Sequence, residues 1–517
     1  MTESDLPVAN LTPGHWGNPA QSVELPAAAL AALKHLGVHR PTAPSPAGEV
    51  ASGLTSAQLE FLASVVGAQH VAADWGSRWA HARGYSTTDL LRFRAGDTSD
   101  TPDAVVYPGT HDEVQAILSG AAEHGLAVVP YAGGTSVVGG LAPARSFVTL
   151  DLRRLDQLLE LDEISRTATL QAGVRGPAAE ALLAERGYTL GHFPQSYEGA
   201  SIGGYAAARS SGQSSAGYGR FDQMVVALTL ASPRGTIELG RAPMSAAGPD
   251  LRQLILGSEG AFGVITSVVV RIRPRPAERH FEGWHFGDFD AGLTAVRRLA
   301  QDGPLPTVLR LSDEVETAVN LADPDVLGGG AGGVLAIIGF DGPYNQATAD
   351  VLTAAGGTNL GAGPGETWRL GRYRAPYLRD PLLDEGALVE TLETATFWSR
   401  IPALKTAVTQ ALVDALGATP PLVLCHVSHV YETGASLYFT VICAQTDDPI
   451  TQWRTAKAAA NQAIADAGGT ISHHHGVGTD HRDAYAAEIG PLAVEALQAV
   501  KQTLDPDHVM NPGILLP

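Results

Sequence analysis

The sequence predicts an α+β protein of two or three domains, and three observations lead to that fold class. The chain has 517 residues, which is too long for one ordinary hydrophobic core. From Pro102 onward, short β-rich runs alternate with helical segments. After Pro276 a second strand-rich pattern begins and continues almost to the C-terminus. An apolar content of 44% is ample for globular folding.

Composition limits the classes of function. A formal net charge of −20 argues against nucleic-acid binding, because no general cationic surface is available to displace phosphate counterions. The only two cysteines, Cys425 and Cys443, exclude a disulfide framework and fit a reducing compartment. The first residues lack the form of a secretory signal, and no apolar run is long enough for a membrane span. We therefore expect a soluble, cytoplasmic protein, with peripheral membrane contact and homodimer formation left open.

Residues 1 to about 95 are predicted to form a mostly helical segment. Ala28 to Leu36 are apolar at helical spacing, and the run Thr55-Ser56-Ala57-Gln58 has the form of a capping box for the next helix. These residues indicate no particular chemistry.

The next stretch predicts a strand, a helix and a second strand that leads into a glycine-rich loop. Ala104 to Pro108 form the first strand, Thr110 is the N-cap of a helix over Asp112 to His124, and Ala127 to Pro130 form the second strand. The loop Tyr131 to Gly140 would expose backbone N–H groups, which suits a phosphate or pyrophosphate. It lacks the ending of a P-loop, so a plain turn is an equally good interpretation of this loop alone.

Two further glycine-rich segments strengthen the interpretation as a binding site. Gln195 to Gly204, which Arg209 to Gly212 soon follow, and Gly257 to Ile265 are separated by two predicted strands, Val225 to Ala231 and Gly235 to Leu239. Several such loops between short strands predict one large cleft lined by backbone, as an extended dinucleotide requires.

Together, these three segments resemble the FAD-binding domain of the vanillyl-alcohol-oxidase and p-cresol-methylhydroxylase (PCMH) type, over about 102–275. The resemblance implies two α+β subdomains that clasp FAD. The first loop has no His of the kind that attaches flavin in some relatives, so we expect non-covalent FAD. A surface charge is the alternative for Arg209. The implied cofactor contacts are Pro130, Tyr131, Ala132, Gly133, Gly134, Thr135, Ser136, Gln195, Ser196, Ser201, Arg209, Ser210, Ser211, Glu259, Gly260, Gly263, Val264 and Ile265.

The second half of the chain predicts a cap domain over the flavin. The alternating prolines of Arg271 to Pro276 end the first sheet. Two strand-rich halves with helices on one side then fit a ferredoxin-like cap. Leu327 to Gly333 and Gly361 to Gly365 are glycine-rich connections, most simply loops. The expected division is a helical segment (1–95), the FAD-binding domain (96–275), the cap (276–500) and a tail returning to the FAD domain (501–517). Strands are expected at 281–286, 307–311, 334–340, 422–430, 436–443 and 470–472, and helices at 289–300, after Pro343 and at 450–467.

Three consecutive histidines, His473, His474 and His475, are the rarest local feature of the chain. On an extended segment His473 and His475 would share one face and His474 would lie on the other. At most two imidazoles would then converge locally, which is short of a zinc ligand set, so no metal is predicted. A metal site, a polar turn, and a catalytic or substrate-binding cluster remain open on this pattern alone.

Tyr438 is a candidate acid or base. It lies in a predicted hairpin strand, where Tyr438, Thr440 and Ile442 share one face. A strand tyrosine is more often a packing residue, which is the alternative here.

Several further motifs resemble the alkyldihydroxyacetonephosphate synthase family. They are Tyr377 to Asp380, Glu390 to Trp398, Cys425 to Tyr431 and the triple histidine, and the resemblance runs from Trp16-Gly17 to Asn511-Pro512-Gly513. It implies a lipid substrate and a flavoenzyme reaction with no net redox change. In this reaction the acyl chain of acyl-dihydroxyacetone phosphate is exchanged for a fatty alcohol, and the product carries the ether bond of ether lipids. A base removes the proton beside the ketone, the flavin N5 traps the substrate carbon, and the carboxylate leaves.

The same resemblance implies roles for individual residues. Tyr438 matches the acid/base tyrosine, and His473, His474 and His475 match a cluster that lowers its pKa and meets the phosphate. Arg379 and Arg310 match substrate-site arginines, whose guanidinium forks suit a phosphate. An ion pair across the cap is the alternative for Arg310.

Other readings are open. Family members often carry a Lys soon after the His-Gly-Val-Gly run, where this chain has Thr479-Asp480-His481. The alternative enzyme is an FAD-dependent 2-hydroxy-acid dehydrogenase of the same superfamily, and a third possibility is a flavin-binding relative without activity.

Overall fold

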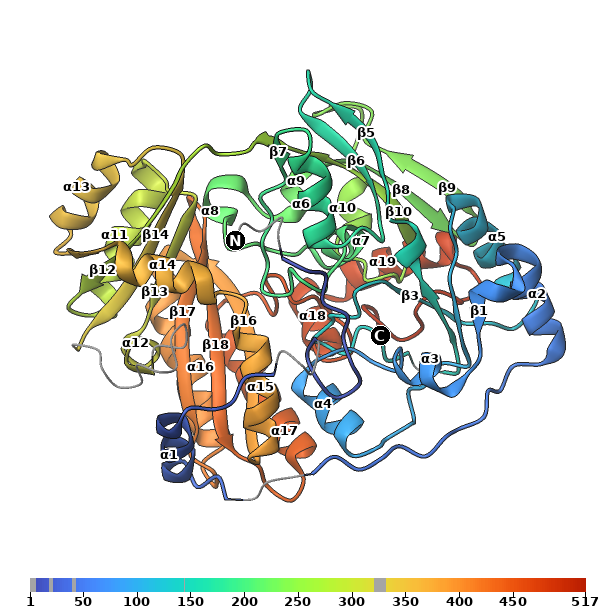
Figure 1. The fold of residues 1–517 in the computed structure, drawn as a ribbon, viewed down its shortest axis with the longest axis horizontal. Coiled ribbons are helices and arrows are strands. Elements are labelled where there is room, and N and C mark those ends of the chain that lie inside the picture. Colours follow the sequence, from blue (N-terminus) through green and yellow to red (C-terminus); the bar gives the residue numbers. More distant parts are fainter. Residues whose placement is uncertain (1–5, 18–21, 40–42, 144, 320–331) are drawn as a thin grey trace.

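The computed structural model describes residues 6–17, 22–39, 43–143, 145–319 and 332–517. The N-terminal segment holds four helices, α1 (Ala27–His35), α2 (Ser56–Val66), α3 (Trp75–Trp79) and α4 (Thr87–Arg94), joined by long non-helical stretches (Figure 1). The prediction of a mostly helical segment is therefore only partly right. The predicted capping box is confirmed, since the Thr55 hydroxyl accepts from the Gln58 amide and the Gln58 side chain accepts from the Thr55 amide.

The first subdomain of the FAD-binding region is a four-stranded sheet in the order β1-β2-β4-β3. Its strands are β1 (Val71–Ala72), β2 (Ala104–Val106), β3 (Val128–Tyr131) and β4 (Val148–Asp151), and β2, β4 and β3 run parallel. Helix α5 (His111–Ala121) packs Val114, Ile117 and Leu118 into the core of this subdomain. Thr110 caps α5 as predicted, because its hydroxyl accepts from the Glu113 amide.

The second subdomain is an antiparallel sheet of five strands in the order β5-β6-β10-β8-β9. The strands are β5 (Leu158–Asp162), β6 (Thr167–Gln171), β8 (Val225–Ser232), β9 (Gly235–Leu239) and β10 (Val264–Arg271). The accompanying helices are α6 (Gly176–Ala184), α7 (Ile202–Ala208), α8 (Ser215–Tyr218), α9 (Phe221–Met224) and α10 (Arg252–Ile255). A two-stranded ribbon, β7 (Tyr188–Thr189) with β11 (Arg273–Pro274), follows the end of β10.

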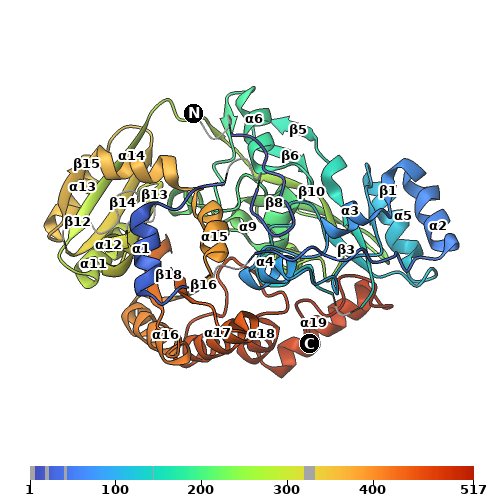
Figure 2. The same ribbon diagram turned by 60° about the horizontal axis from the view of Figure 1, so that its bottom comes forward.

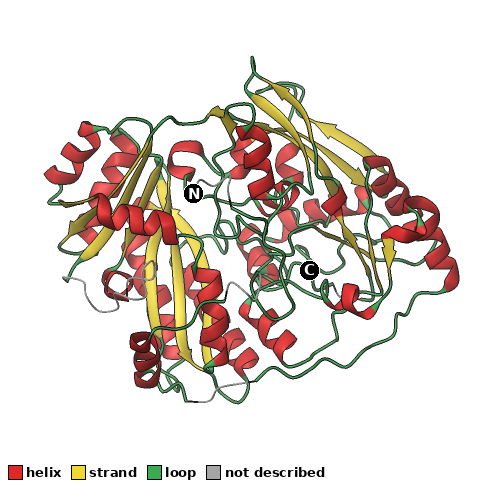
Figure 3. Cartoon of the chain, viewed as in Figure 1, coloured by secondary structure: helices red, strands yellow, loops and turns green. Residues whose placement is uncertain are grey.

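The cap is one antiparallel sheet of seven strands in the order β15-β12-β14-β13-β17-β18-β16 (Figures 1 and 3). Leu299 of α11, Val408 of α16 and Ala460 of α17 belong to the hydrophobic core that this sheet shares with its helices. The strands are β12 (Arg279–Phe286), β13 (Val308–Ser312), β14 (Val334–Asp341), β15 (Thr358–Gly361), β16 (Ala387–Phe397), β17 (Leu422–Val430) and β18 (Gly434–Ala444). The helices are α11 (Phe289–Asp302), α12 (Glu314–Val319), α13 (Gln346–Ala354), α14 (Ala362–Gly371), α15 (Ala375–Asp384), α16 (Ile401–Ala415) and α17 (Pro449–Asp466).

Most of the strands and helices predicted for the cap are present. The expected strand at 470–472 is wrong, since Thr470 forms only an isolated bridge to Ala395. The long strand β16 was not predicted as an element. Most of the connection predicted at 327–333 lies outside the described residues. The loop predicted at 361–365 is wrong, because β15 ends at Gly361 and α14 begins directly at Ala362.

The chain ends with α18 (Arg482–Ile489) and α19 (Pro491–Leu504), which continue a row of helices formed by α16 and α17 (Figure 2). After α19 the tail lies against the first subdomain, where the Val128 amide donates to Val509 O and the Asn511 amide donates to Val128 O, at 2.8 and 2.9 Å. The domain boundaries themselves remain predictions. Across the described residues, no helix has both the length and the apolar character that a bilayer crossing requires.

Candidate active site

A cavity of about 450 Å³ separates the FAD-binding region from the cap sheet. This volume is in the usual range for a bound small molecule or cofactor. One wall consists of the loops after β3 and around α7 and residues 258–265, together with residues 194–196. The opposite wall consists of one face of β13, β17, β18 and β16, with α15 beside it.

The predicted cofactor loops converge on this cavity. Every residue predicted to contact the cofactor lines it, with the exception of Arg209. The loops pack so closely that a Cβ added at Gly133 would lie 2.4 Å from the carbonyl oxygen of Gly199. A concave wall of glycine, serine and backbone groups fits the pyrophosphate and ribose of an extended dinucleotide.

Arg209 is the predicted cofactor contact that does not line the cavity in the described structure. Its guanidinium pairs with the carboxylate of Asp222 at 2.9 Å and donates to the carbonyl oxygens of Leu256 and Gln253. Arg209 therefore ties the end of α7 to α10 as a partly exposed ion pair, and its contact with the cofactor stays a prediction.

Tyr438 lies at the centre of the cap wall. In the β ladder it is opposite Glu393 of β16 and His426 of β17, so all three side chains belong to the same face. Thr440 and Ile442 line the cavity beside it, which confirms the predicted common face. The Tyr438 ring stacks on His426 at 5.0 Å between centroids and lies 5.6 Å from His475 and 6.2 Å from His474.

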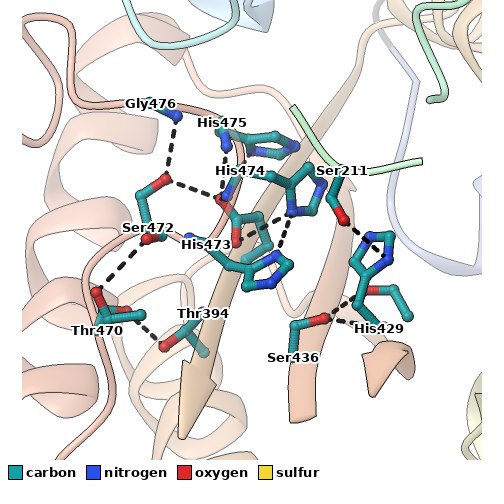
Figure 4. A network of polar contacts seen from close by, with 12 residues as sticks. Ser211, Thr394, His429, Ser436, Thr470, Ser472, His473, His474, His475 and Gly476 are labelled. Atoms are coloured by element: carbon teal, nitrogen blue, oxygen red, sulfur yellow. Dashed lines mark hydrogen bonds and ion pairs between the residues drawn. The ribbon is translucent and has the colours of Figure 1, made fainter. Parts of the chain in front are cut away.

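The segment of three histidines forms a tight bend around the buried carboxylate of Glu393. The backbone amides of His473, His474 and His475 all donate to Glu393, at 2.7, 3.0 and 2.9 Å. The Ser472 hydroxyl adds a fourth hydrogen bond at 2.9 Å (Figure 4). The expected extended geometry is therefore wrong, because three successive amides that converge on one acceptor require a bend.

The bend changes which imidazoles reach the cavity. His474 and His475 both line it, whereas His473 is turned away and its Nε2 lies 2.5 Å from the Tyr431 hydroxyl. The Nδ1 atoms of His473 and His474 are 2.9 Å apart. His473, predicted as part of the catalytic cluster, therefore does not line the cavity itself, and it contacts the cavity-lining ring of His474.

His429 joins this cluster, and sequence reasoning did not include it among the site residues. The β17–β18 register shifts between Val427 and His429, and this bulge turns His429 toward Ser211 and Ser215, whose hydroxyls lie 3.1 and 2.6 Å from its Nδ1. Ligand atoms of His429, His473 and His474 lie within 4.8 Å of one another and could hold a metal ion. The triple histidine supplies two of these three imidazoles, and the third comes from β17, which the prediction of local convergence did not cover.

The other end of the histidine segment is held from the FAD-binding region. The Glu259 carboxylate accepts from the amides of Val477 and Gly478, at 2.8 and 3.0 Å. Gly478 has a φ of +52°, and a Cβ there would lie 1.9 Å from the carbonyl oxygen of Val138. Glycine at this position lets the segment pass against the first cofactor loop.

The two predicted substrate arginines, Arg310 and Arg379, differ in their hydrogen-bond partners. Both line the cavity, but Arg310 forms an ion pair with Glu316 at 2.5 Å and contacts the His426 ring at 2.9 Å, which is the ion pair across the cap. Arg379 has a buried Nε with no hydrogen-bond partner among the described residues. Arg379 is therefore the better-placed of the two to bind an anion.

Known proteins match the chain along most of its length. Residues 102–240 match a family described as FAD binding domain, and residues 275–515 match one described as FAD linked oxidases, C-terminal domain. The alkyldihydroxyacetonephosphate synthase of Dictyostelium discoideum is 32% identical over 85% of this chain and 77% of its own length. The enzyme of that name from Trypanosoma brucei brucei is 32% identical over 89% and 80%.

The chain belongs to the alkyldihydroxyacetonephosphate synthase family. A solved structure of an alkyldihydroxyacetonephosphate synthase superposes with a TM-score of 0.83 and 27% identity, covering 97% of this chain and 98% of the other. p-Cresol methylhydroxylase, at a TM-score of 0.70 and 16% identity, shares the fold. The protein is accordingly an FAD-dependent enzyme, and the α+β fold with a FAD-binding region and a cap is confirmed.

The pKa of Tyr438 shifts in the opposite direction to the one that the family resemblance implies. Desolvation in the cavity raises the pKa of Tyr438 to about 12 and outweighs the hydrogen bond to Thr391. The resemblance implied a phenol whose pKa the histidines lower, and that expectation is wrong here. Desolvation also lowers the pKa of His475 to about 3, and it lowers that of His474, so both rings are neutral near pH 7.

The two buried glutamates have opposite shifts. Burial acts to raise the pKa of Glu393, but His474, His475, His473 and the amide donors outweigh it and hold the pKa well below the usual range. For Glu259, burial dominates over its two amide donors and raises the pKa to about 7. Glu393 is therefore ionised at neutral pH, whereas Glu259 is close to its midpoint.

Proposed function

We propose that this enzyme exchanges the acyl chain of acyl-dihydroxyacetone phosphate for a fatty alcohol and so forms an ether bond without net redox change. The observation that carries the proposal is the placement of Tyr438, His474 and His475 on one cavity that the FAD-binding loops also line. The names of the family members at 30–32% identity support it.

The residues of the cavity suit the parts of such a substrate. The unpaired Nε of Arg379 favours an anionic group such as phosphate. Four apolar side chains of the cap, Leu378, Leu382, Val389 and Ile442, line the same cavity and would contact an alkyl chain. The net charge of −20 makes such a local cation necessary for a phosphorylated substrate.

The protonation states assign the proton steps. With neutral rings at pH 7, His474 or His475 can accept the proton beside the ketone and later return it to that carbon. The neutral Tyr438 hydroxyl can donate its proton to the leaving carboxylate oxygen, and the phenolate so formed can accept the proton that the entering alcohol loses. FAD, when bound, supplies an electrophilic ring system next to these groups. We propose that it is held non-covalently by the loops at 130–136, 195–201 and 258–265.

The experiment mixes purified FAD-loaded protein with acyl-dihydroxyacetone phosphate and a long-chain alcohol, without an electron acceptor. Release of one fatty acid for each ether product, with the flavin oxidised at the end, is the expected result. Absence of ether product with both substrates saturating would overturn the proposal. Gel filtration with light scattering would test whether the protein forms the homodimer that the sequence leaves open. Flotation on phospholipid vesicles would test peripheral membrane contact.

A second candidate function is oxidation of a 2-hydroxy acid. The His429, His473 and His474 cluster favours it, since three neutral imidazoles can ligate a metal. The glycolate oxidase subunit GlcD of Bacillus subtilis is 26% identical over 80% of the chain. Bleaching of the flavin by a 2-hydroxy acid, lost on chelation and restored by Zn²⁺, would support this function over the first.

A further inference from the structure

We infer that Glu393 is a positioning residue that sets which ring nitrogens of His474 and His475 face the cavity. Glu393 is 1% exposed, lies outside the cavity wall and sits directly opposite Tyr438 in the β16–β18 ladder. Its two carboxylate oxygens accept hydrogen bonds from the amides of His473, His474 and His475 and from the hydroxyl of Ser472. The inference rests on the proposed function only for the chemical use of the two rings.

The ring nitrogens nearest Glu393 are the Nδ1 atoms. His474 Nδ1 lies 3.5 Å from one carboxylate oxygen and His475 Nδ1 lies 4.0 Å from the other. A negative oxygen at that distance favours a protonated nitrogen over a lone pair. Each ring therefore carries its hydrogen on Nδ1, and Nε2 is left as a bare acceptor on the side away from Glu393.

The contact between His473 and His474 has two possible hydrogen arrangements, and Glu393 selects one. Their Nδ1 atoms are 2.9 Å apart, so one of them must donate. With Glu393 beside it, His474 Nδ1–H donates to His473 Nδ1, and His473 Nε2–H then donates to the Tyr431 oxygen at 2.5 Å. In the reverse arrangement Tyr431 would donate, and His474 would present Nε2–H to the cavity as a donor in place of a base.

The first test reads the tautomers and needs no substrate. The FAD-loaded protein is labelled with ¹⁵N-histidine, and signals are assigned by subtraction with His474→Gln and His475→Gln. We expect Nδ1–H tautomers for His474 and His475 in the wild type, and a mixture or reversal in Glu393→Gln. Nε2–H tautomers for both rings in the wild type would overturn the inference.

The second test measures kinetics, with a matched control on the same strand. Glu390→Gln removes another buried carboxylate of β16, which accepts from the Thr87 amide at 2.6 Å and does not line the cavity. For Glu393→Gln we expect kcat to fall on the order of 100-fold with KM changed little, while Glu390→Gln has much the smaller effect. Equal losses in kcat for the two variants would contradict the inference.

A third variant covers the case in which Glu393→Gln fails to fold or to bind FAD. Glu393→Asp keeps the charge and should retain Nδ1–H tautomers with part of the activity. Reversed tautomers in Glu393→Asp would contradict the inference. Failure of the proposed function is distinguishable, because the wild type would then give no ether product while the tautomer result would stand unchanged.

Discussion

At each end of the segment from His473 to Gly478, a buried glutamate accepts hydrogen bonds from backbone amides. The electrostatic surroundings of the two glutamates differ. Glu393, from the cap, binds the amides at one end, and Glu259, from the FAD-binding region, binds those at the other. Three imidazoles surround Glu393 and hold its pKa low, whereas Glu259 has only amide donors and its pKa rises to about 7. The cap end therefore keeps a fixed charge near neutral pH, and the flavin end can change its charge.

The largest expected effect is a loss of turnover at the cap end without a loss of stability. In Tyr438→Phe the proton donor is lost, so turnover should fall by about 10²- to 10⁴-fold. The FAD-binding loops do not depend on this hydroxyl, and flavin content and the free energy of unfolding should stay close to wild type. Steady-state rates and the flavin absorbance of the purified variant measure both. Turnover at the wild-type level in Tyr438→Phe would remove this residue from the catalytic set.

The next effect compares the two carboxylates directly. Glu393→Ala leaves three buried amides without their acceptor and should cost about 3–5 kcal/mol of unfolding free energy, measured in urea. Glu259→Ala leaves two amides without theirs and should cost less. If Glu259→Ala is the more destabilising variant, the hydrogen bonds from the FAD-binding region stabilise the segment more than those from the cap.

A pH series tests the difference in charge. Because the pKa of Glu259 is raised from 4.5 to about 7, the folded state binds its proton more tightly than the unfolded state in that window. Stability contributed by this group is therefore lost as pH rises from 4.5 to 7, on the order of 2–3 kcal/mol. In Glu259→Gln this part of the slope should disappear, as urea unfolding at pH 5 and pH 8 would show. Identical slopes in the two proteins would mean that Glu259 is ionised throughout.

The sequence was informative where the signal is local. Strand alternation located β17 and β18, and the spacing of the glycine-rich loops located the cofactor wall, because both depend on neighbouring residues. The shape of the histidine segment depends on a carboxylate 80 residues earlier in the chain, and no local pattern could supply it.

Two of the missed residues show what kind of signal was available. Glu393 lies in the β-rich run of β16, and acidic residues are uncommon in strands, so its position was a usable signal. His429 is different, because strict alternation assigns it to the face of Cys425 and Val427. Only the β-bulge, which depends on pairing with β18, turns it toward the other histidines.

The smallest expected effect concerns Arg209, which lies at the end of α7 in the FAD-binding region. Its guanidinium is about 30% exposed and pairs with Asp222, outside the cavity wall. Arg209→Gln should therefore change the unfolding free energy by about 1 kcal/mol or less and leave the FAD dissociation constant unchanged. Glu259→Gln, measured in the same titration, is the matched variant from within the cavity wall and should weaken FAD binding more. A loss of FAD affinity in Arg209→Gln that equals the loss in Glu259→Gln would show that the α7–α10 junction, and not the cavity wall alone, sets the shape of the cofactor site.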